Sequence, residues 1–115
     1  MLTKGSLGEA LAEQFLVARG FRVIGRNVRA GRREIDLVVE KGSTVVLVEV
    51  KFRRRDSSEA WRRAQKARAG EAALTLMEQW PGRTVRFDLV TIEEEARGWT
   101  LRHYPGAWSP SGSFW

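Results

Sequence analysis

The stretch from Glu34 to Lys51 constrains the fold most, because it predicts two β-strands joined by a tight turn. On both sides of Gly42-Ser43, apolar and mostly β-branched residues recur at the two-residue period of a strand. A Gly-Ser pair between two such runs is typical of a two-residue hairpin loop. The sequence therefore predicts an antiparallel hairpin in the first half of the chain.

The position of the turn fixes which residues face each other. With a two-residue loop, Lys41 pairs with Thr44, and continuing that ladder brings Asp36 opposite Glu49. Cβ atoms directly opposite each other lie about 4.5–5.5 Å apart, so these two carboxylates would repel each other. A slip of one residue would move them to opposite faces of the sheet. The register therefore decides whether a site can exist here.

A divalent cation between Asp36 and Glu49 would remove this repulsion. Mg²⁺ binds proteins through one or two carboxylates and takes further oxygens from its substrate. A bound ion of this kind activates water and polarises a phosphoryl group. Lys51 lies beside Glu49 on the same predicted face, where it can orient that water or stabilise developing charge. The register therefore favours a site for Mg²⁺ or Mn²⁺ between Asp36 and Glu49, with Lys51 beside it.

The same register also allows a purely structural interpretation. Glu34 falls opposite Lys51, and a cross-strand ion pair between them would contribute at most about 1 kcal/mol. That interpretation leaves the pairing of Asp36 with Glu49 unexplained, so the metal site is preferred.

The net charge of +6 is unevenly distributed along the chain. The positive excess lies in residues 1–68, which include the hairpin, whereas residues 69–115 are slightly acidic. Such clustering favours a polyanionic partner. DNA is the expected partner and RNA stays open; the alternative is a basic composition that only keeps the protein in solution. The candidate phosphate-binding residues flank the hairpin and continue beyond it: Arg29, Arg32, Arg33, Arg53, Arg54, Arg55, Arg62 and Lys66.

The remaining periodicities predict two long helices and three further strands. Because a helix precedes the last two strands, the chain must cross over, which gives one α/β sandwich with a mixed central sheet in the order α-β-β-β-α-β-β. The first 105 residues form the single domain, and residues 106–115 form an aromatic C-terminal tail. The expected elements outside the hairpin are a helix at 3–19, a strand at 21–30, a helix at 57–80 and strands at 84–93 and 99–104.

Glu9 and His103 each allow two interpretations. Ser6 and Glu9 are spaced as in a capping box, so the local pattern makes Glu9 part of the cap of the first helix. The alternative is a third carboxylate aimed at the metal. His103 is the only histidine, which rules out a histidine metal cluster, and it is interpreted as a packing or surface residue.

Bulk features point to a cytoplasmic protein with no membrane partner. No apolar run approaches the roughly 20 residues that span a bilayer, and the N-terminus lacks the apolar core of a signal peptide. The chain has no cysteine and hence no disulfide framework.

Asp36 followed by Glu49-Val50-Lys51 resembles the signature of the PD-(D/E)xK nuclease superfamily. With Gly8-Glu9 added, the whole chain more closely resembles the YraN-type family of small uncharacterised bacterial proteins, which are similar to archaeal Holliday-junction resolvases. The resemblance implies a restriction-endonuclease-like fold. It also implies that Asp36 and Glu49 are metal ligands, that Lys51 is their charged partner and that Glu9 is a further acid of the site.

Two positions depart from the family pattern. Arg33 replaces a frequent Gly, and Ile35 stands at the proline position of the superfamily signature. Neither change removes a ligand. The expected function is a metal-dependent endonuclease acting on branched or otherwise structured DNA. Two cuts at a junction need two sites, which leaves a homodimer open. The alternatives are a non-catalytic nucleic-acid-binding module and a structural protein that docks through its aromatic tail.

Overall fold

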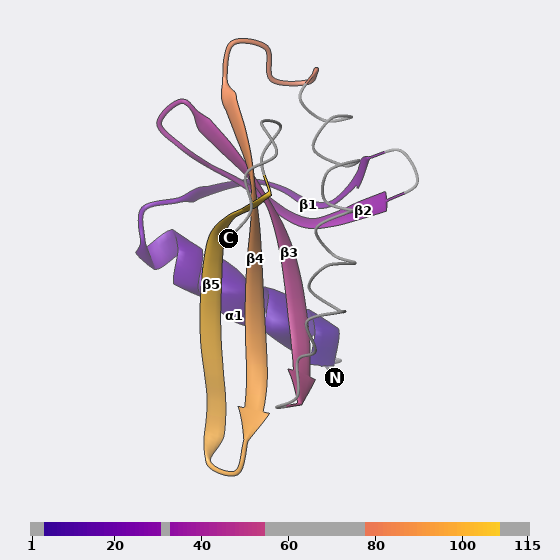
Figure 1. Ribbon diagram of the computed structural model, residues 1–115, viewed down its shortest axis with the longest axis vertical. Helices are drawn as coiled ribbons and strands as arrows, with labels where there is room; N and C mark the ends of the chain where they lie inside the picture. Colours follow the sequence, from indigo (N-terminus) through magenta and orange to yellow (C-terminus); the bar gives the residue numbers. More distant parts are fainter. Residues whose placement is uncertain (1–3, 31–32, 55–77, 109–115) are drawn as a thin grey trace.

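The computed structural model describes residues 4–30, 33–54 and 78–108 (Figure 1). One helix and five strands lie in these ranges. They are α1 (Lys4–Ala18), β1 (Arg22–Ala30), β2 (Arg33–Lys41), β3 (Thr44–Arg54), β4 (Thr84–Glu95) and β5 (Gly98–Trp108).

The five strands form one mixed sheet in the order β1-β2-β3-β4-β5, and α1 crosses one of its faces (Figure 1). Neighbouring strands are antiparallel except for β3 and β4, which are parallel. The predicted α/β class and mixed sheet are therefore confirmed. Parallel neighbours need a long crossover connection. The helix predicted at 57–80 lies mostly outside the described residues, and its last three positions, Glu78 to Trp80, form a turn.

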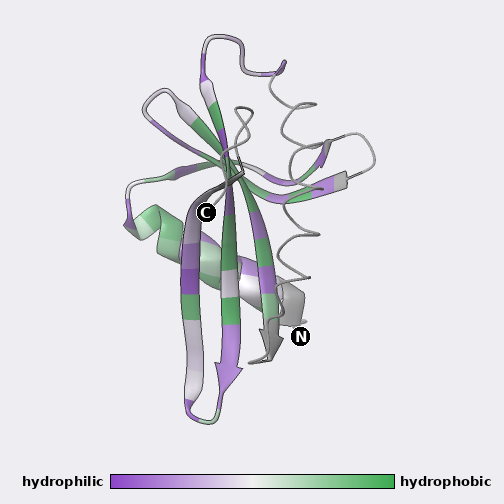
Figure 2. Ribbon diagram, viewed as in Figure 1, coloured by the Kyte–Doolittle hydropathy of each residue, from purple (hydrophilic) through white to green (hydrophobic). Residues whose placement is uncertain are grey.

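Each face of the sheet buries its own apolar cluster. On the α1 face, Ala12 and Leu16 of the helix pack on a set that includes Val46, Val48 and Val90. The opposite face buries a second cluster built from the alternate residues of the same strands: Val45, Leu47, Val85, Phe87 and Leu89. Figure 2 shows the apolar bands of the central strands and of α1, with hydrophilic residues toward the strand ends. β3 and β4 are thus apolar on both sides, as expected of interior strands.

One face of α1 is buried against the sheet. Gly8, Ala12 and Leu16, spaced by four residues, are buried, whereas Ala10 and Ala18 are exposed. Gly8 lets the helix approach the sheet closely.

The predicted hairpin register is confirmed over its first five pairs. The ladder between β2 and β3 runs from Lys41–Thr44 to Leu37–Val48. The further pairs predicted for Asp36 with Glu49 and for Glu34 with Lys51 are not part of it. Beyond Leu37–Val48, β2 continues beside β1 while β3 continues beside β4, so the strands separate.

The side-chain alternation of β2 breaks at Asp36. Ile35 and Leu37 were expected on one face, because residues two apart in a strand share a face. Instead, Leu37 packs in the cluster under α1 and Ile35 packs in the cluster on the opposite face. Across from this point on β1, Asn27 has a φ of 52°. The irregularity therefore coincides with the point where β2 leaves β3.

Two other predicted boundaries were wrong. The strand expected at 84–93 continues through Glu94 and Glu95, and the turn consists of Ala96 and Arg97. β5 extends to Trp108, so the strand includes the first three residues of the predicted tail. The rest of the tail lies outside the described residues.

Replacing Gly8 by Val should destabilise the protein by about 1–3 kcal/mol, the usual cost of overpacking. A Cβ at this position would lie 3.2 Å from the Cβ of Phe52 and 3.5 Å from Cδ1 of Ile92, so the helix would have to move away from the sheet. Urea unfolding measures the loss. Ala10→Val is the matched control, because Ala10 is exposed on the same helix and should cost less than about 0.7 kcal/mol. Equal losses in both variants would contradict the close approach of helix and sheet.

Candidate functional site

Asp36 lies where β2 and β3 separate, and its side chain takes over a backbone interaction. The Val50 amide donates a hydrogen bond to Oδ2 of Asp36 at 2.7 Å. In a continued antiparallel ladder this amide would donate to a backbone carbonyl of β2. An unpaired buried amide is costly, so the carboxylate satisfies a need that the separation of the strands creates. The same hydrogen bond fixes the orientation of Asp36.

Glu49 and Lys51 lie on β3 on either side of Val50, on the face opposite α1. Glu49 is buried, with 6% of its surface exposed, and Lys51 is half-buried. Nζ of Lys51 lies 3.6 Å from Oε1 of Glu49. The structure therefore brings together the three residues that the hairpin pattern singled out, although Asp36 reaches the group from a diverging strand.

Glu9 joins this group from the helix. The capping-box prediction for Glu9 was wrong, because α1 begins at Lys4 and Ser6 already lies inside it. The pKa of Glu9 is raised, chiefly by burial and then by the negative charges of Glu34 and Glu49. Glu9 thus lies within the field of the acidic residues of β2 and β3.

Asp36 shows the strongest electrostatic effect of the group. Burial, followed by the charge of Glu49, raises the pKa of Asp36 from 3.8 to about 7. The Val50 hydrogen bond and Lys51 oppose this shift, and Glu9 adds to it. Carboxyl groups whose pKa is raised this far by burial and by a neighbouring carboxylate are frequent in functional sites.

The donor set fits a single hard cation. Among residues 4–30, 33–54 and 78–108, no group of three or more Asp, Glu or His side chains is arranged to hold a metal ion. Asp36 and Glu49 are two carboxylates, and Mg²⁺ commonly uses one or two protein carboxylates while water and substrate complete its octahedral shell. A cation here would also offset the repulsion that raises the pKa of Asp36.

A small cavity opens between α1 and the strands beside this group. An ion pair spans it, with Nε and Nη2 of Arg26 donating to the two carboxylate oxygens of Glu13 at 2.8 and 2.9 Å. Arg26 pairs in the sheet with Leu37, the neighbour of Asp36. The ion pair therefore links the helix that carries Glu9 to the strands that carry Asp36. The cavity is lined by Ser6, Glu9, Ala10, Glu13, Arg26 and Leu37.

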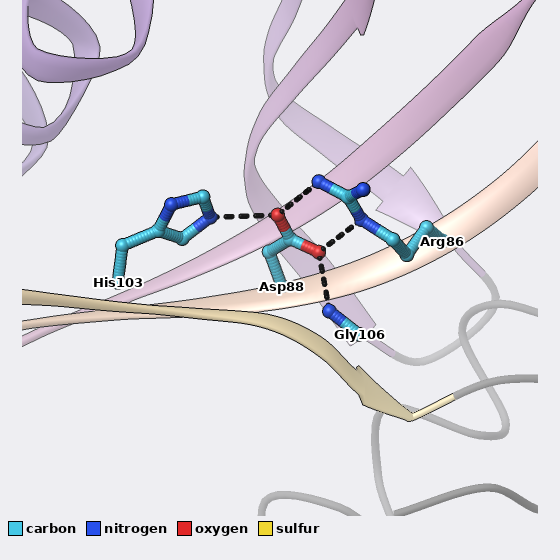
Figure 3. A network of polar contacts seen from close by, with 4 residues as sticks. All are labelled: Arg86, Asp88, His103 and Gly106. Atoms are coloured by element: carbon cyan, nitrogen blue, oxygen red, sulfur yellow. Dashed lines mark hydrogen bonds and ion pairs between the residues drawn. The ribbon is translucent and has the colours of Figure 1, made fainter. Parts of the chain in front are cut away.

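Sequence reasoning missed a second polar cluster, centred on Asp88 of β4 (Figure 3). Asp88 is fully buried. Arg86 donates to both of its oxygens at 2.7 and 2.8 Å, Nε2 of His103 lies 2.7 Å from Oδ2, and the Gly106 amide donates to Oδ1 at 2.9 Å. His103 also packs edge-on against Phe15 of α1, so its predicted packing role holds only in part. A single acid inside an apolar strand was the available signal.

The cluster changes the shape of β5. Pairing with β4 shifts between Leu89–Tyr104 and Phe87–Trp108, which leaves a bulge opposite Asp88. Gly106 lies in that bulge with a φ of 66° and turns its amide to the carboxylate. Burial alone would raise the pKa of Asp88, but the hydrogen bonds from His103, Arg86 and Gly106 outweigh it and hold the pKa below its usual value.

The predicted phosphate-binding residues are only partly within the described chain. Arg29 is exposed on β1. Arg33, Arg53 and Arg54 have their backbones in β2 and β3. Outside the described residues lie Arg32, Arg55, Arg62 and Lys66. The basic surface therefore stays a prediction. In the described part of the chain, no helix has the length and apolar character that a membrane span requires.

Residues 8–92 match the profile of the uncharacterised protein family UPF0102. The chain belongs to this family. Membership confirms the resemblance to the YraN-type proteins. The matched segment contains Glu9, Asp36, Glu49 and Lys51, and Asp88 of the second cluster as well.

Several UPF0102 relatives align with most of this chain. One from Oleidesulfovibrio alaskensis is 38% identical over 103 residues, which cover 84% of this chain and 50% of the relative. This chain thus spans about half the length of that protein. A relative from Corynebacterium efficiens is 37% identical over 108 residues, covering 89% of this chain and 88% of its own.

Among solved structures, the chain is similar to SfsA of Pyrococcus furiosus in complex with Ca²⁺. The TM-score is 0.43 at 15% sequence identity, and the match covers 89% of this chain and 62% of SfsA.

Asp36→Asn should make the protein more stable above about pH 7, without divalent metal, and should have little effect below about pH 4. The folded carboxyl holds its proton up to about pH 7 but the unfolded one only to about 3.8, so the stability of the wild type falls as the pH rises through this window. Asn keeps an oxygen for the Val50 amide and carries no charge. Urea unfolding across this pH range tests the prediction. Parallel stability curves for the two proteins would contradict it.

Asp88→Asn should lower the free energy of unfolding by about 3 kcal/mol. The change removes the negative partner of the Arg86 guanidinium. It also places an Asn amide group where His103 and the Gly106 amide donate to a carboxylate in the wild type. The low end of the usual range applies because 33% of the Arg86 side chain is exposed. Thermal and urea unfolding measure the effect. Glu95→Gln, which alters an exposed hydrogen bond to Thr100, is the control and should stay within about 0.5 kcal/mol. Equal effects of the two changes would contradict a central role for Asp88.

Proposed function

We propose that this chain is a metal-dependent nuclease whose catalytic group is Asp36, Glu49, Lys51 and Glu9. The observation that carries the proposal is the placement of the Asp36 carboxylate, which the Val50 amide holds at 2.7 Å against β3, directly beside buried Glu49. Burial and the charge of Glu49 raise the pKa of Asp36 to about 7, and a divalent cation would offset this repulsion. Nζ of Lys51 lies 3.6 Å from Oε1 of Glu49, where it would supply the positive charge that phosphodiester hydrolysis uses to stabilise the phosphate.

Each residue has a role that follows from its position. Asp36 and Glu49 would hold Mg²⁺ or Mn²⁺, and the Val50 amide holds the Asp36 carboxylate against β3 at the residue after Glu49. The ion, when bound, would supply an activated water and polarise the phosphoryl group. Lys51 would orient the attacking water or stabilise charge on the phosphate. Glu9 would orient a water from the helix side, since its carboxyl lies in the field of Glu49.

Nucleic acid is the substrate class that the charge supports. The net charge is +6, and the basic residues are concentrated in the part of the chain that holds the catalytic group. Counterion release from the phosphate backbone would supply affinity without sequence preference. DNA with a branched or unpaired region is the proposed substrate. A homodimer would serve a four-way junction, where two cuts need two sites.

The proposal is tested by a cleavage assay with Mg²⁺ or Mn²⁺ on duplex, single-stranded, flap and four-way-junction DNA and on RNA. Asp36→Asn, Glu49→Gln and Lys51→Ala should each slow cleavage by at least about 100-fold, as expected when one electrostatic stabiliser of a transition state is lost. Glu78→Gln, which changes an exposed acidic residue before the start of β4, is the matched control and should cleave like the wild type.

Metal binding is measured on the same proteins by calorimetry. The wild type should bind Mn²⁺, and the Asp36→Asn/Glu49→Gln double variant should not. Metal and nucleic-acid binding without cleavage on any substrate would favour the alternative, a non-catalytic module that keeps the nuclease-like site. If the wild type binds no metal even with DNA present, the proposed nuclease is wrong.

A further inference from the structure

Among the side chains that the structure describes, Trp99 is the one large aromatic that is exposed. Trp99 lies in β5 directly after the turn of the β4–β5 hairpin, and 46% of its surface is exposed. This hairpin forms one end of the molecule along its long axis (Figure 1). An exposed indole offers a flat apolar face together with a polar N–H group, a combination that is enriched in binding surfaces.

Trp99 is held in place by a second aromatic ring. Its indole meets the ring of Phe52 on β3 at an interplanar angle of 76°, with ring centroids 5.7 Å apart. Phe52 in turn packs against Gly8 of α1, where a Cβ would lie 3.2 Å from its own Cβ. The indole is therefore fixed from one side, while nearly half of the residue stays open to solvent. A fixed, accessible ring is a suitable surface for stacking.

The aromatic pair is joined to both chain segments that carry catalytic residues. Phe52 directly follows Lys51 on β3, and Gly8 directly precedes Glu9 on α1. Within the described residues, β3 beyond Val48 pairs only with β4, so this part of the strand has an edge that β2 no longer covers. The indole is therefore connected to the catalytic group through Phe52 and Gly8, the chain neighbours of Lys51 and Glu9.

The described residues next to Trp99 do not favour electrostatic attraction of a polyanion. Three successive acidic residues of β4, Glu93 to Glu95, pair in the sheet with Thr100, Trp99 and Gly98. Stacking of a base on an aromatic ring needs no charge, and it tolerates any base sequence.

We propose that Trp99 is a stacking site for an unpaired nucleobase of the strand that enters the catalytic group. The inference rests on the proposed function and adds to it a preference for substrates with unpaired bases. A base inside a duplex is already stacked on its neighbours, and taking it out costs a few kcal/mol. A flap, a single strand or the open centre of a junction offers such a base without this cost.

The test is equilibrium binding of fluorescently labelled oligothymidylate in EDTA, where no cleavage occurs. Trp99→Ala should weaken binding by about 5- to 100-fold, the range expected for loss of one stacked base. Trp99→Phe, which keeps a ring, should lose much less. The fold loss should be the same at low and high salt, because a stacking contact releases no counterions. Wild-type tryptophan fluorescence should be quenched by the oligonucleotide, and Trp99→Phe should lose that part of the quenching.

Val17→Ala is the matched control, because Val17 is about as exposed as Trp99. Val17 lies at the C-terminal end of α1, whereas Gly8 and Glu9 lie near its N-terminal end. This variant should bind like the wild type. A blunt duplex of the same length should show a smaller loss for Trp99→Ala than the single strand does. Equal affinity of wild type and Trp99→Ala for the single strand overturns the inference and leaves the nuclease proposal intact. A loss that disappears at high salt also overturns it. Failure of the wild type to bind any nucleic acid overturns both.

Discussion

The separation of β2 from β3 after the Leu37–Val48 pair is the constraint on which the rest of the site depends. Two antiparallel strands that part leave backbone groups without partners, and such groups must be satisfied. Here the Asp36 carboxylate accepts the Val50 amide. That contact places a negative charge next to Glu49, on a strand buried on both faces. Oδ2 of Asp36 thus satisfies the Val50 amide and at the same time fixes the carboxyl group of the proposed site.

The helix completes the arrangement because it is held at two points. At its start, Gly8 allows α1 to lie against Phe52, which sets the depth of the helix. One turn further, Glu13 is tied to Arg26 of β1 by two hydrogen bonds. Glu9 lies between these two points, so its position relative to the strands is fixed although it belongs to a separate layer. An exposed ion pair contributes little to stability, and its effect here is geometric.

The hairpin register could be predicted from the sequence because a short Gly-Ser loop leaves little freedom in pairing, and the pairs from Lys41–Thr44 to Leu37–Val48 follow from it. The point where the strands part could not, since the alternation of residues continues unchanged through Asp36. The role of Glu9 was misassigned for a related reason: the spacing of Ser6 and Glu9 mimics a capping box although both residues lie inside the helix. Local patterns describe neighbours along the chain, whereas these features are set by contacts between strands and layers.

Asp88 and Asp36 show that the same type of side chain can stabilise the fold at one position and form part of a proposed site at another. Asp88 is fully enclosed, yet its partners include a bidentate Arg86, and its pKa lies below the ordinary value. Asp36 receives a single backbone amide and faces Glu49, and its pKa rises to about 7. Asp88 is fully buried and Asp36 only partly, so burial alone would favour the larger upward pKa shift at Asp88. What distinguishes them is whether the fold supplies the compensating positive charge itself. Where it does, the carboxylate stabilises the sheet; where it does not, the carboxyl is the one that we propose to bind a cation from solution. That contrast is why the second cluster is assigned to structure and the site at Asp36 to chemistry.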